Sequence, residues 1–285
     1  PWGIAARRQP HGRRRGRGQR TDSNATFVNA APAQTLTLAS PTRRWLRRMP
    51  GVMCEGQPHY RSTGGSKATN PKGWLECARI YFMITPMLEQ RIGQQFIDSA
   101  DLKYQAAEQM SKPIAAAIQA LMACVTNGGK VLACGNGGSA ADCQHFAAEF
   151  VGRFERERPE LAALALTTDS SILTAVANDY NFEQIFAKQV RALGQPGDVL
   201  LAISTSGNSA NVIAAMEAAH EREMTIIAMT GKGGGRMGQL LRETDFHLCV
   251  PHDRTARIQE VHLLALHCLC DGVDTLLLGT QEGNV

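Results

Sequence analysis

Short, mainly apolar runs alternate with segments of helical periodicity along residues 87–285. The runs are too short for helices and are typical of strands buried on both faces of a sheet. We expect strands over residues 130–134, 161–166, 198–203, 225–229 and 246–250. We expect helices over residues 87–110, 113–126, 140–156, 172–177, 182–193, 210–221, 237–241 and 256–278. This alternation predicts an α/β fold, a doubly wound parallel sheet with flanking N- and C-terminal helices.

Proline and glycine punctuate the first helical region. Pro113 is expected to begin the second helix, because the first turn of a helix tolerates a residue without a backbone N–H. Asn127-Gly128-Gly129 is expected to end that helix, since glycine is favoured just past a helix C-terminus.

Charge divides the chain near residue 82. Residues 1–82 hold 15 Lys and Arg against three acidic residues, a net charge of +12, so the remaining 203 residues, with 15 basic and 23 acidic groups, carry −8. The first segment is rich in Arg, Pro, Gly and Ser and has no periodic apolar positions, which is typical of disordered chain. We therefore expect a disordered basic arm over residues 1–82 and one folded domain over residues 83–285.

The basic arm has more than one interpretation. The printed chain begins with Pro1, and Met83 and Met87 open a segment of different composition, so we expect the arm to be upstream sequence outside the working protein. An arm that binds nucleic acid through phosphate contacts is the alternative, and an Arg-rich, acid-poor start also resembles a transit peptide. The acidic remainder offers no overall basic field for nucleic acid.

Cysteine usage and hydropathy indicate the cellular compartment. No uninterrupted apolar run is long enough for a transmembrane helix, and the eight cysteines are scattered through apolar segments without CxxC pairs. We expect a cytoplasmic protein whose thiols mostly act as small buried apolar groups.

Two polar turns follow strands of the expected sheet. GNGGS over residues 135–139 follows the first strand, and STSGNS over residues 204–209 follows the third. Ligands of doubly wound folds bind beyond the carboxyl ends of the strands, where both turns are expected. Glycines allow close backbone approach, and helix N-termini attract anions. Turn and N-cap chemistry explains either turn alone, but the two together predict a sugar-phosphate site.

Metal-binding residue types lie at helical spacing on two expected helices. His145 and Glu149 are four residues apart and project from one side of a helix, and Gln259 and His267, eight apart, share one broad face. Imidazole nitrogen and carboxylate or amide oxygen suit Zn²⁺. A His–Glu pair at this spacing is also an ordinary helix-surface contact, and a histidine in an apolar helix is often a core residue. These residues alone leave both interpretations open.

Several motifs in register resemble one family. GNGGSAAD over residues 135–142, AND over 177–179, STSGNSANV over 204–212 and RIQEVH over 257–262 are similar to the sugar isomerase (SIS) domains of the bacterial phosphoheptose isomerase group. The likeness extends from about Leu88 to Gly279. It implies a flavodoxin-like, three-layer SIS domain that forms a homotetramer with sites completed between subunits. It also implies interconversion of sedoheptulose 7-phosphate and D-glycero-D-manno-heptose 7-phosphate, which supplies heptose for the lipopolysaccharide core.

The resemblance also assigns residue roles. It implies one Zn²⁺ per subunit, with Glu149 as general base and His267 as general acid and base. The implied metal ligands are His145, Glu149, Gln259 and His267. The implied substrate-binding residues are Asn136, Gly137, Gly138, Ser139, Glu149, Asn178, Asp179, Ser204, Thr205, Ser206, Ser209 and Gln259.

A second resemblance points to a different class of protein. Residues 153–166, 186–204 and 257–271 are also similar to the DnaA initiator-associating protein, a non-enzymatic tetramer built on the same domain. That protein lacks Glu and His at the positions matching Glu149 and His267, so their presence here favours the isomerase. A third class, a sugar-phosphate-sensing transcription regulator, needs a helix-turn-helix, and residues 1–82 show none.

Overall fold

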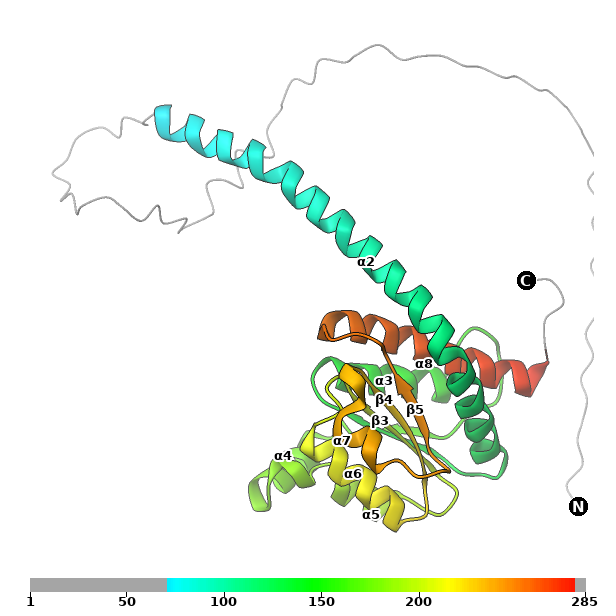
Figure 1. Ribbon diagram of the computed structural model, residues 1–285. Coiled ribbons are helices and arrows are strands. Elements are labelled where there is room, and N and C mark those ends of the chain that lie inside the picture. Colours follow the sequence, from blue (N-terminus) through cyan, green and yellow to red (C-terminus); the bar gives the residue numbers. More distant parts are fainter. Residues whose placement is uncertain (1–70, 280–285) are drawn as a thin grey trace, which may run out of the picture. The chain divides into compact units, whose positions relative to one another are not determined.

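The structure is a computed structural model that describes residues 71–279, with side chains from residue 85 onward (Figure 1). Within these residues, five parallel strands form one sheet in the order β2-β1-β3-β4-β5. The strands are β1 (Val131–Gly135), β2 (Ala163–Ala165), β3 (Val199–Ser204), β4 (Thr225–Thr230) and β5 (Phe246–Cys249). The predicted doubly wound parallel sheet is confirmed. Its order reverses between β1 and β3, which is where such folds bind ligands.

The central strands are buried on both faces. Every residue of β1 and of β3 is buried, because helices cover both sides of a parallel sheet. Successive side chains alternate between two cores: Val131 and Ala133 join one, and Leu132 and Cys134 join the other. The continuous apolar runs of the sequence therefore reflect two cores that share one sheet.

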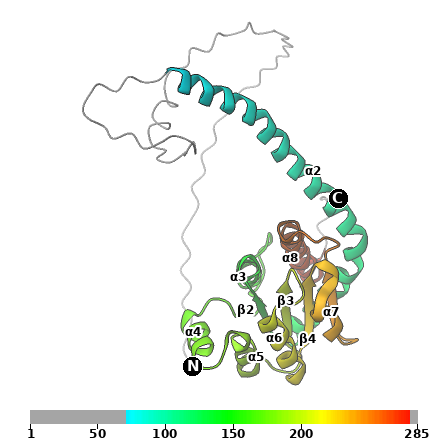
Figure 2. The same ribbon diagram turned by 60° about the vertical axis from the view of Figure 1, so that its left-hand side comes forward.

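The helices form two layers. α2 (Pro71–Thr126), α3 (Gly138–Val151) and α8 (Thr255–Leu278) contribute to the first core. α5 (Ala187–Leu193), α6 (Ala210–Glu221) and α7 (Gly235–Leu240) contribute to the second. α4 (Ser170–Asp179) packs on the short helix η1 (Phe182–Gln184), which packs on α6, and η2 (Lys232–Gly234) precedes α7. Figure 2 shows the sheet between α3 and α8 on one side and α5 and α6 on the other, which confirms the three-layer architecture.

α2 corrects two expectations from the sequence. It is continuous over 56 residues with Pro86 and Pro113 inside it, so Pro113 begins no new helix and the two helices expected over 87–110 and 113–126 are one. A proline inside a helix removes one backbone hydrogen bond, and the packing of α2 against α8 and β5, with Leu121 buried, offsets that loss. The boundary expected after residue 82 falls inside this helix, because residues 71–82 are helical. The rest of the expected arm, residues 1–70, lies outside the described residues.

α8 is a core helix of unusually apolar composition. Among the described residues it alone is long and apolar enough to cross a membrane, with a mean hydropathy of 1.5. Ile258, Leu266 and Val273 are fully buried in the first core, and α8 packs on both α2 and α3. Core packing accounts for its apolar character.

Candidate active site

The carboxyl ends of β1 and β3 lie side by side, because Gly135 pairs with Ile203 in the sheet. The turns that follow are joined by two amide side chains. Asn136 Nδ2 donates to Asn211 Oδ1 at 2.9 Å, and Asn211 Nδ2 donates to Asn136 Oδ1 at 2.8 Å. Asn211 is buried in the first turn of α6. The reciprocal pair fixes the spacing of the two polar turns, which meet at one sheet edge as the sequence predicts.

The turn after β3 gathers three serine hydroxyls. Ser204 Oγ lies 2.8 Å from Ser209 Oγ and 3.4 Å from Ser206 Oγ. Ser209 is the N-cap of α6, and its side chain makes no capping hydrogen bond. Thr205 is half-buried between these serines. Hydroxyls beside a helix N-terminus that no side chain caps suit a phosphate group.

The serine turn rests on the glycine-rich turn after β4. A Cβ added to Gly207, where φ is 64°, would lie 2.0 Å from the carbonyl oxygen of Gly234. Arg236 N donates to Asn208 Oδ1 at 3.0 Å, and Asn208 Nδ2 donates to the Ser206 carbonyl at 2.9 Å. Gly207 and Asn208 therefore hold the serine turn against α7. Sequence reasoning missed both as site residues, because their partners lie on a turn almost 30 residues away.

The turn after β1 opens α3 without a side-chain cap. Gly137 is the N-cap, with a φ of 56° in the left-handed region that glycine favours. A Cβ on Gly138 would lie 2.3 Å from Gln259 Nε2, so the Gln259 side chain from α8 sits directly over this glycine. Ser139 is buried behind them. The structure thus brings Gln259 to the turn after β1.

His145, Glu149 and His267 converge between α3 and α8. The Nε2 atoms of the two histidines are 2.9 Å apart, and Glu149 Oε1 lies 3.5 Å from His145 Nε2. The His145 side chain is 40% exposed and that of Glu149 19% exposed, so a ligand can reach both. The Phe154 ring packs against His267 with centroids 5.5 Å apart. Three of the four metal ligands expected from the resemblance therefore form one cluster, while the Gln259 side chain lies over Gly138.

The donor set of this cluster fits zinc by its chemistry. Two imidazoles and a carboxylate are ligands that zinc accepts, and the amide oxygen of Gln259, which lies over Gly138, is another ligand type that suits it. In the described part of the chain, no three His, Cys, Asp or Glu side chains are already placed to hold a metal ion. The facing imidazoles instead stand at hydrogen-bond distance, so one Nε2 donates and the other accepts. Binding a metal requires both nitrogens to present lone pairs to it.

Asp142 is a candidate that sequence reasoning missed. It lies on α3 one turn before His145, and its Oδ2 atom is buried without a hydrogen-bond partner. Burial raises the pKa of the Asp142 carboxyl, while the neighbouring His145 acts in the opposite direction. A buried, unpaired carboxylate oxygen beside a histidine is typical of a functional site. The spacing of three residues to His145 is the signal that points to it.

Asn178 and Asp179 lie at the end of α4. Asn178 Nδ2 donates to Asp179 Oδ1 at 2.9 Å, and both residues are exposed. Among the described residues, the hydrogen bonds that join the other candidates do not extend to this pair. Their contact with the sugar stays a prediction.

The chain is similar to known proteins of one family. Residues 95–231 match the SIS domain family. The chain is 72% identical over 196 residues to the phosphoheptose isomerase of Methylibium petroleiphilum, covering 69% of this chain and 98% of that protein. It is 70% identical over 195 residues to the phosphoheptose isomerase of an Azoarcus species, covering 68% of this chain and 99% of that protein.

Two solved structures show the same fold. The phosphoheptose isomerase of Neisseria gonorrhoeae is 55% identical with a TM-score of 0.63, over 66% of this chain and 99% of that one. The phosphoheptose isomerase of Francisella tularensis is 48% identical with a TM-score of 0.64, over 65% of this chain and 97% of that one. With these similarities, the chain belongs to the phosphoheptose isomerase family of SIS-domain proteins.

Proposed function

We propose that this chain is an aldose–ketose isomerase that interconverts sedoheptulose 7-phosphate and D-glycero-D-manno-heptose 7-phosphate. The observation that carries the proposal is the convergence of Glu149 and His267 beside His145, in a chain 72% identical to a named phosphoheptose isomerase. The same pair favours an enzyme over a non-enzymatic initiator-binding protein.

The reaction moves one hydrogen between C1 and C2 of the sugar, and two side chains suffice for the proton transfers. Starting from the ketose, the Glu149 carboxylate removes a proton from C1 while an N–H of the His267 imidazole gives a proton to the C2 oxygen. The C1–H electron pair becomes the C1–C2 double bond of an enediol. Glu149 then returns its proton to C2, and His267 takes the proton of the C1 hydroxyl. The aldose forms, and both side chains regain their starting states.

The opposite end of the substrate is held by the serine turn. We propose that Ser139, Ser204, Thr205, Ser206 and Ser209 bind the phosphate. Hydroxyl donors and the N-terminus of α6 can replace the hydration of an anion without a nearby Lys or Arg.

The sugar hydroxyls meet amide and carboxylate groups. Asn178, Asp179 and Gln259 are proposed to bind them, together with Asn136. The Asn136 amide gives one N–H and one oxygen lone pair to Asn211, which leaves one of each for the sugar. The pairing with Asn211 therefore orients Asn136 without exhausting it.

We further propose one Zn²⁺ per subunit, with His145, Glu149, Gln259 and His267 as ligands. When bound, zinc polarises the oxygens that carry the developing negative charge. Independently of the metal, His145 stands against His267 and orients its imidazole, and the Phe154 ring shields one side of it from water.

The surface of α2 supports a homotetramer. Leu88, Ile92 and Phe96 follow at spacings of four, so they share one helix face, and all three are exposed. Other exposed apolar side chains of this helix are Met87, Ile97 and Tyr104. A continuous exposed apolar face marks an interface. We propose a cytoplasmic homotetramer that supplies heptose phosphate for the lipopolysaccharide core.

The activity is tested by incubating the purified protein with sedoheptulose 7-phosphate and following aldoheptose formation and C1 proton exchange by NMR. Glu149→Gln is expected to abolish turnover while the protein still folds and binds sugar phosphate. Glu157→Gln is the matched control, because that carboxylate is 85% exposed and pairs only locally with Arg153. Near-normal turnover by Glu149→Gln would contradict the assigned base. No aldoheptose at any zinc concentration, with capture of the DnaA initiator, would support the binding function instead.

A further inference from the structure

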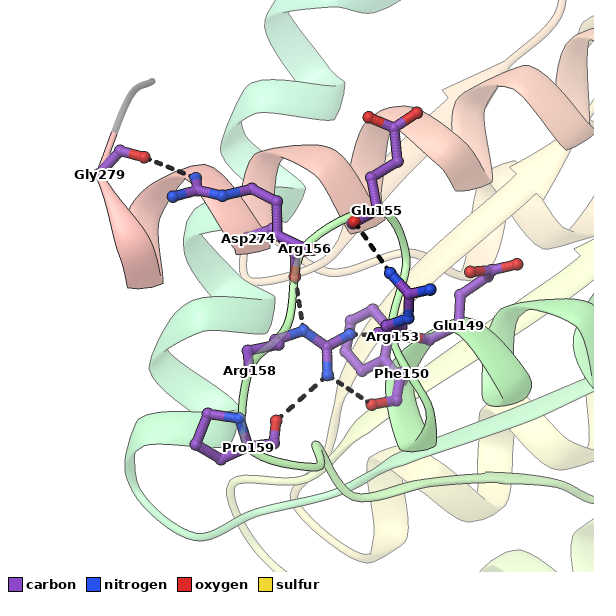
Figure 3. Close-up of polar contacts among 9 residues, drawn as sticks. All are labelled: Glu149, Phe150, Arg153, Glu155, Arg156, Arg158, Pro159, Asp274 and Gly279. Atoms are coloured by element: carbon purple, nitrogen blue, oxygen red, sulfur yellow. Dashed lines mark hydrogen bonds and ion pairs between the residues drawn. The ribbon is translucent and has the colours of Figure 1, made fainter. Parts of the chain in front are cut away.

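We infer that Arg158 and Asp274 form a positioning pair that holds Glu149 and His267 at their working separation, an inference that rests on the catalytic roles proposed above. Arg158 lies in the charged segment between α3 and β2, to which the proposed reaction assigns no role. Its Nε atom donates to Asp274 Oδ1 at 2.6 Å, and the two side chains are only 1% and 2% exposed (Figure 3). This buried ion pair joins the segment after α3 to α8, and α3 and α8 carry the proposed base and acid.

The remaining donors of Arg158 bond the end of α3. Nη2 donates to the Glu149 carbonyl at 2.7 Å, and Nη1 donates to the Phe150 carbonyl at 2.8 Å and the Pro159 carbonyl at 3.2 Å. Carbonyls in the last turn of a helix have no partner within it, and a cation there also complements the helix dipole. The guanidinium therefore fixes the backbone from which the Glu149 side chain projects.

Asp274 fixes the other helix. It lies seven residues beyond His267 on α8, which is about two turns, so both side chains project from the same side. His267 meets α3 through His145, and Asp274 meets the end of α3 through Arg158. α3 and α8 are thus joined directly by the two histidines and indirectly through Arg158, and Glu149 lies in the sequence between His145 and Arg158.

The charges of Glu149, Arg158 and Asp274 all act on the buried thiol of Cys270. Burial raises the pKa of its thiol most, and with the negative charges of Glu149 and Asp274 brings it to about 12, while Arg158 acts in the opposite direction. Glu149 is therefore close enough to this pair for their charges to act on the same atom.

The neighbouring arginines make different contacts. Arg156 Nη1 donates to the Gly279 carbonyl at 2.7 Å, at the end of α8, and Arg153 Nη1 donates to the Glu155 carbonyl at 3.3 Å (Figure 3). Of the three arginines drawn, Arg158 alone bonds the backbone of Glu149. Asp274 Oδ2 is buried without a partner, and a buried ion pair with an unsatisfied oxygen is a poor source of stability. Orientation of α3 against α8 explains the pair better.

The test uses two variants. One is Arg158→Lys, and the other is a double variant that combines Arg158→Met and Asp274→Leu. Lysine keeps the charge beside Asp274, but one ammonium cannot reproduce the planar fork that also reaches two α3 carbonyls. The double variant replaces the pair by apolar side chains, which cores commonly accept without loss of stability. Both variants are expected to melt within a few degrees of the unaltered protein, to lose about tenfold to a hundredfold in kcat, and to keep KM within about twofold.

Arg156→Lys is the matched control and is expected to keep its kcat. Normal kcat in either folded variant would overturn the inference, as would a loss of kcat that only follows the unfolded fraction. Glu149→Gln is assayed in parallel, so that failure of the proposed base can be distinguished from failure of the positioning role of Arg158. If it turns over, the proposed base is wrong and the positioning inference fails with it. If it is inactive while both Arg158 variants are normal, only the positioning inference fails.

Discussion

The side-chain amides of Asn136 and Asn211 donate to each other across the point where the strand order reverses, and Asn211 is 3% exposed. Replacing Asn211 by leucine keeps the volume but leaves the Asn136 amide without its partner. We expect a loss of about 1–3 kcal/mol in the free energy of unfolding. We also expect at least a tenfold higher KM for the sugar phosphate, because the two turns lose their fixed spacing. Urea unfolding and steady-state kinetics measure the two effects.

Asn127→Leu is the control for this substitution. The Asn127 amide is exposed and bonds only the Ala123 carbonyl in the last turn of α2, so both quantities should change little. A destabilised Asn211 variant with an unchanged KM would show that the amide pair has no part in substrate binding.

Gly207→Ala tests the contact between the serine turn and the turn after β4. The new Cβ would meet the Gly234 carbonyl at 2.0 Å, and φ at Gly207 is 64°. We expect the serine turn to shift, and KM for the sugar phosphate to rise more than tenfold with a smaller change in kcat. Gly128→Ala is the control for backbone strain alone. Its φ is 76°, but an added Cβ would meet no atom within 4 Å, so no neighbour has to move. It should lose about 1–2 kcal/mol of stability with a normal KM; equal KM values in the two variants would contradict the expectation.

Zinc removal tests the donor set of the cluster. We expect about one zinc per subunit by elemental analysis of the purified protein, and a loss of turnover on chelation that added zinc reverses. His145→Gln and His267→Gln should each lower the zinc content. His252→Gln should not, because that imidazole bonds locally to the Arg254 N–H. Full turnover by metal-free protein would remove zinc from the mechanism.

Local patterns predicted most of the fold. The expected bounds of β3 and α6 agree with the structure to within one residue, because a short apolar run and an N-cap serine are strong local signals. The expectation that Pro113 begins a new helix is wrong, since the effect of this proline depends on how α2 packs against α8. Tertiary packing outweighed the local preference there.

Local sequence patterns predict less of the site than of the fold. Residue types and their spacing on one helix identify His145 and Glu149 as candidate ligands. Only the family resemblance assigns His267 to the same site. No sequence signal predicts that Arg158 would pair with Asp274, because 116 residues separate them and each side chain alone resembles an exposed charge. Their pairing depends on how the chain brings α3 and α8 together.

The apolar face of α2 predicts the assembly state. Phe96→Asp is expected to lower the molar mass measured by light scattering, because a charge in a buried apolar interface is strongly unfavourable. Phe96 is 74% exposed in the single chain, so the fold itself should tolerate the change. Ile172→Asp on α4, also exposed at 40%, is the control for added charge. An unchanged molar mass for Phe96→Asp would place the interface elsewhere.

His262 predicts how stability depends on pH. It is fully buried on α8, its Nε2 atom bonds the Thr230 carbonyl at 3.0 Å, and its Nδ1 atom has no partner. Burial lowers the pKa of this imidazole to about 4, with the Thr230 bond acting in the opposite direction. The pKa of a histidine in an unfolded chain is about 6.5. Between these values the unfolded chain binds a proton that the folded chain does not, so stability is full above about pH 6.5 and falls as the pH approaches about 4.

His262→Gln isolates this contribution, because glutamine can still donate to the Thr230 carbonyl and does not titrate. Urea unfolding between about pH 7.5 and 4.5, at one protein concentration, should show the unaltered protein losing more stability than the variant, by roughly 2 kcal/mol at about pH 5. His252→Gln removes a half-buried imidazole that bonds only the nearby Arg254 N–H and should leave the pH dependence unchanged. Parallel curves for the unaltered protein and His262→Gln would show that His262 accepts its proton without unfolding, through an opening of α8 that exposes the ring to water.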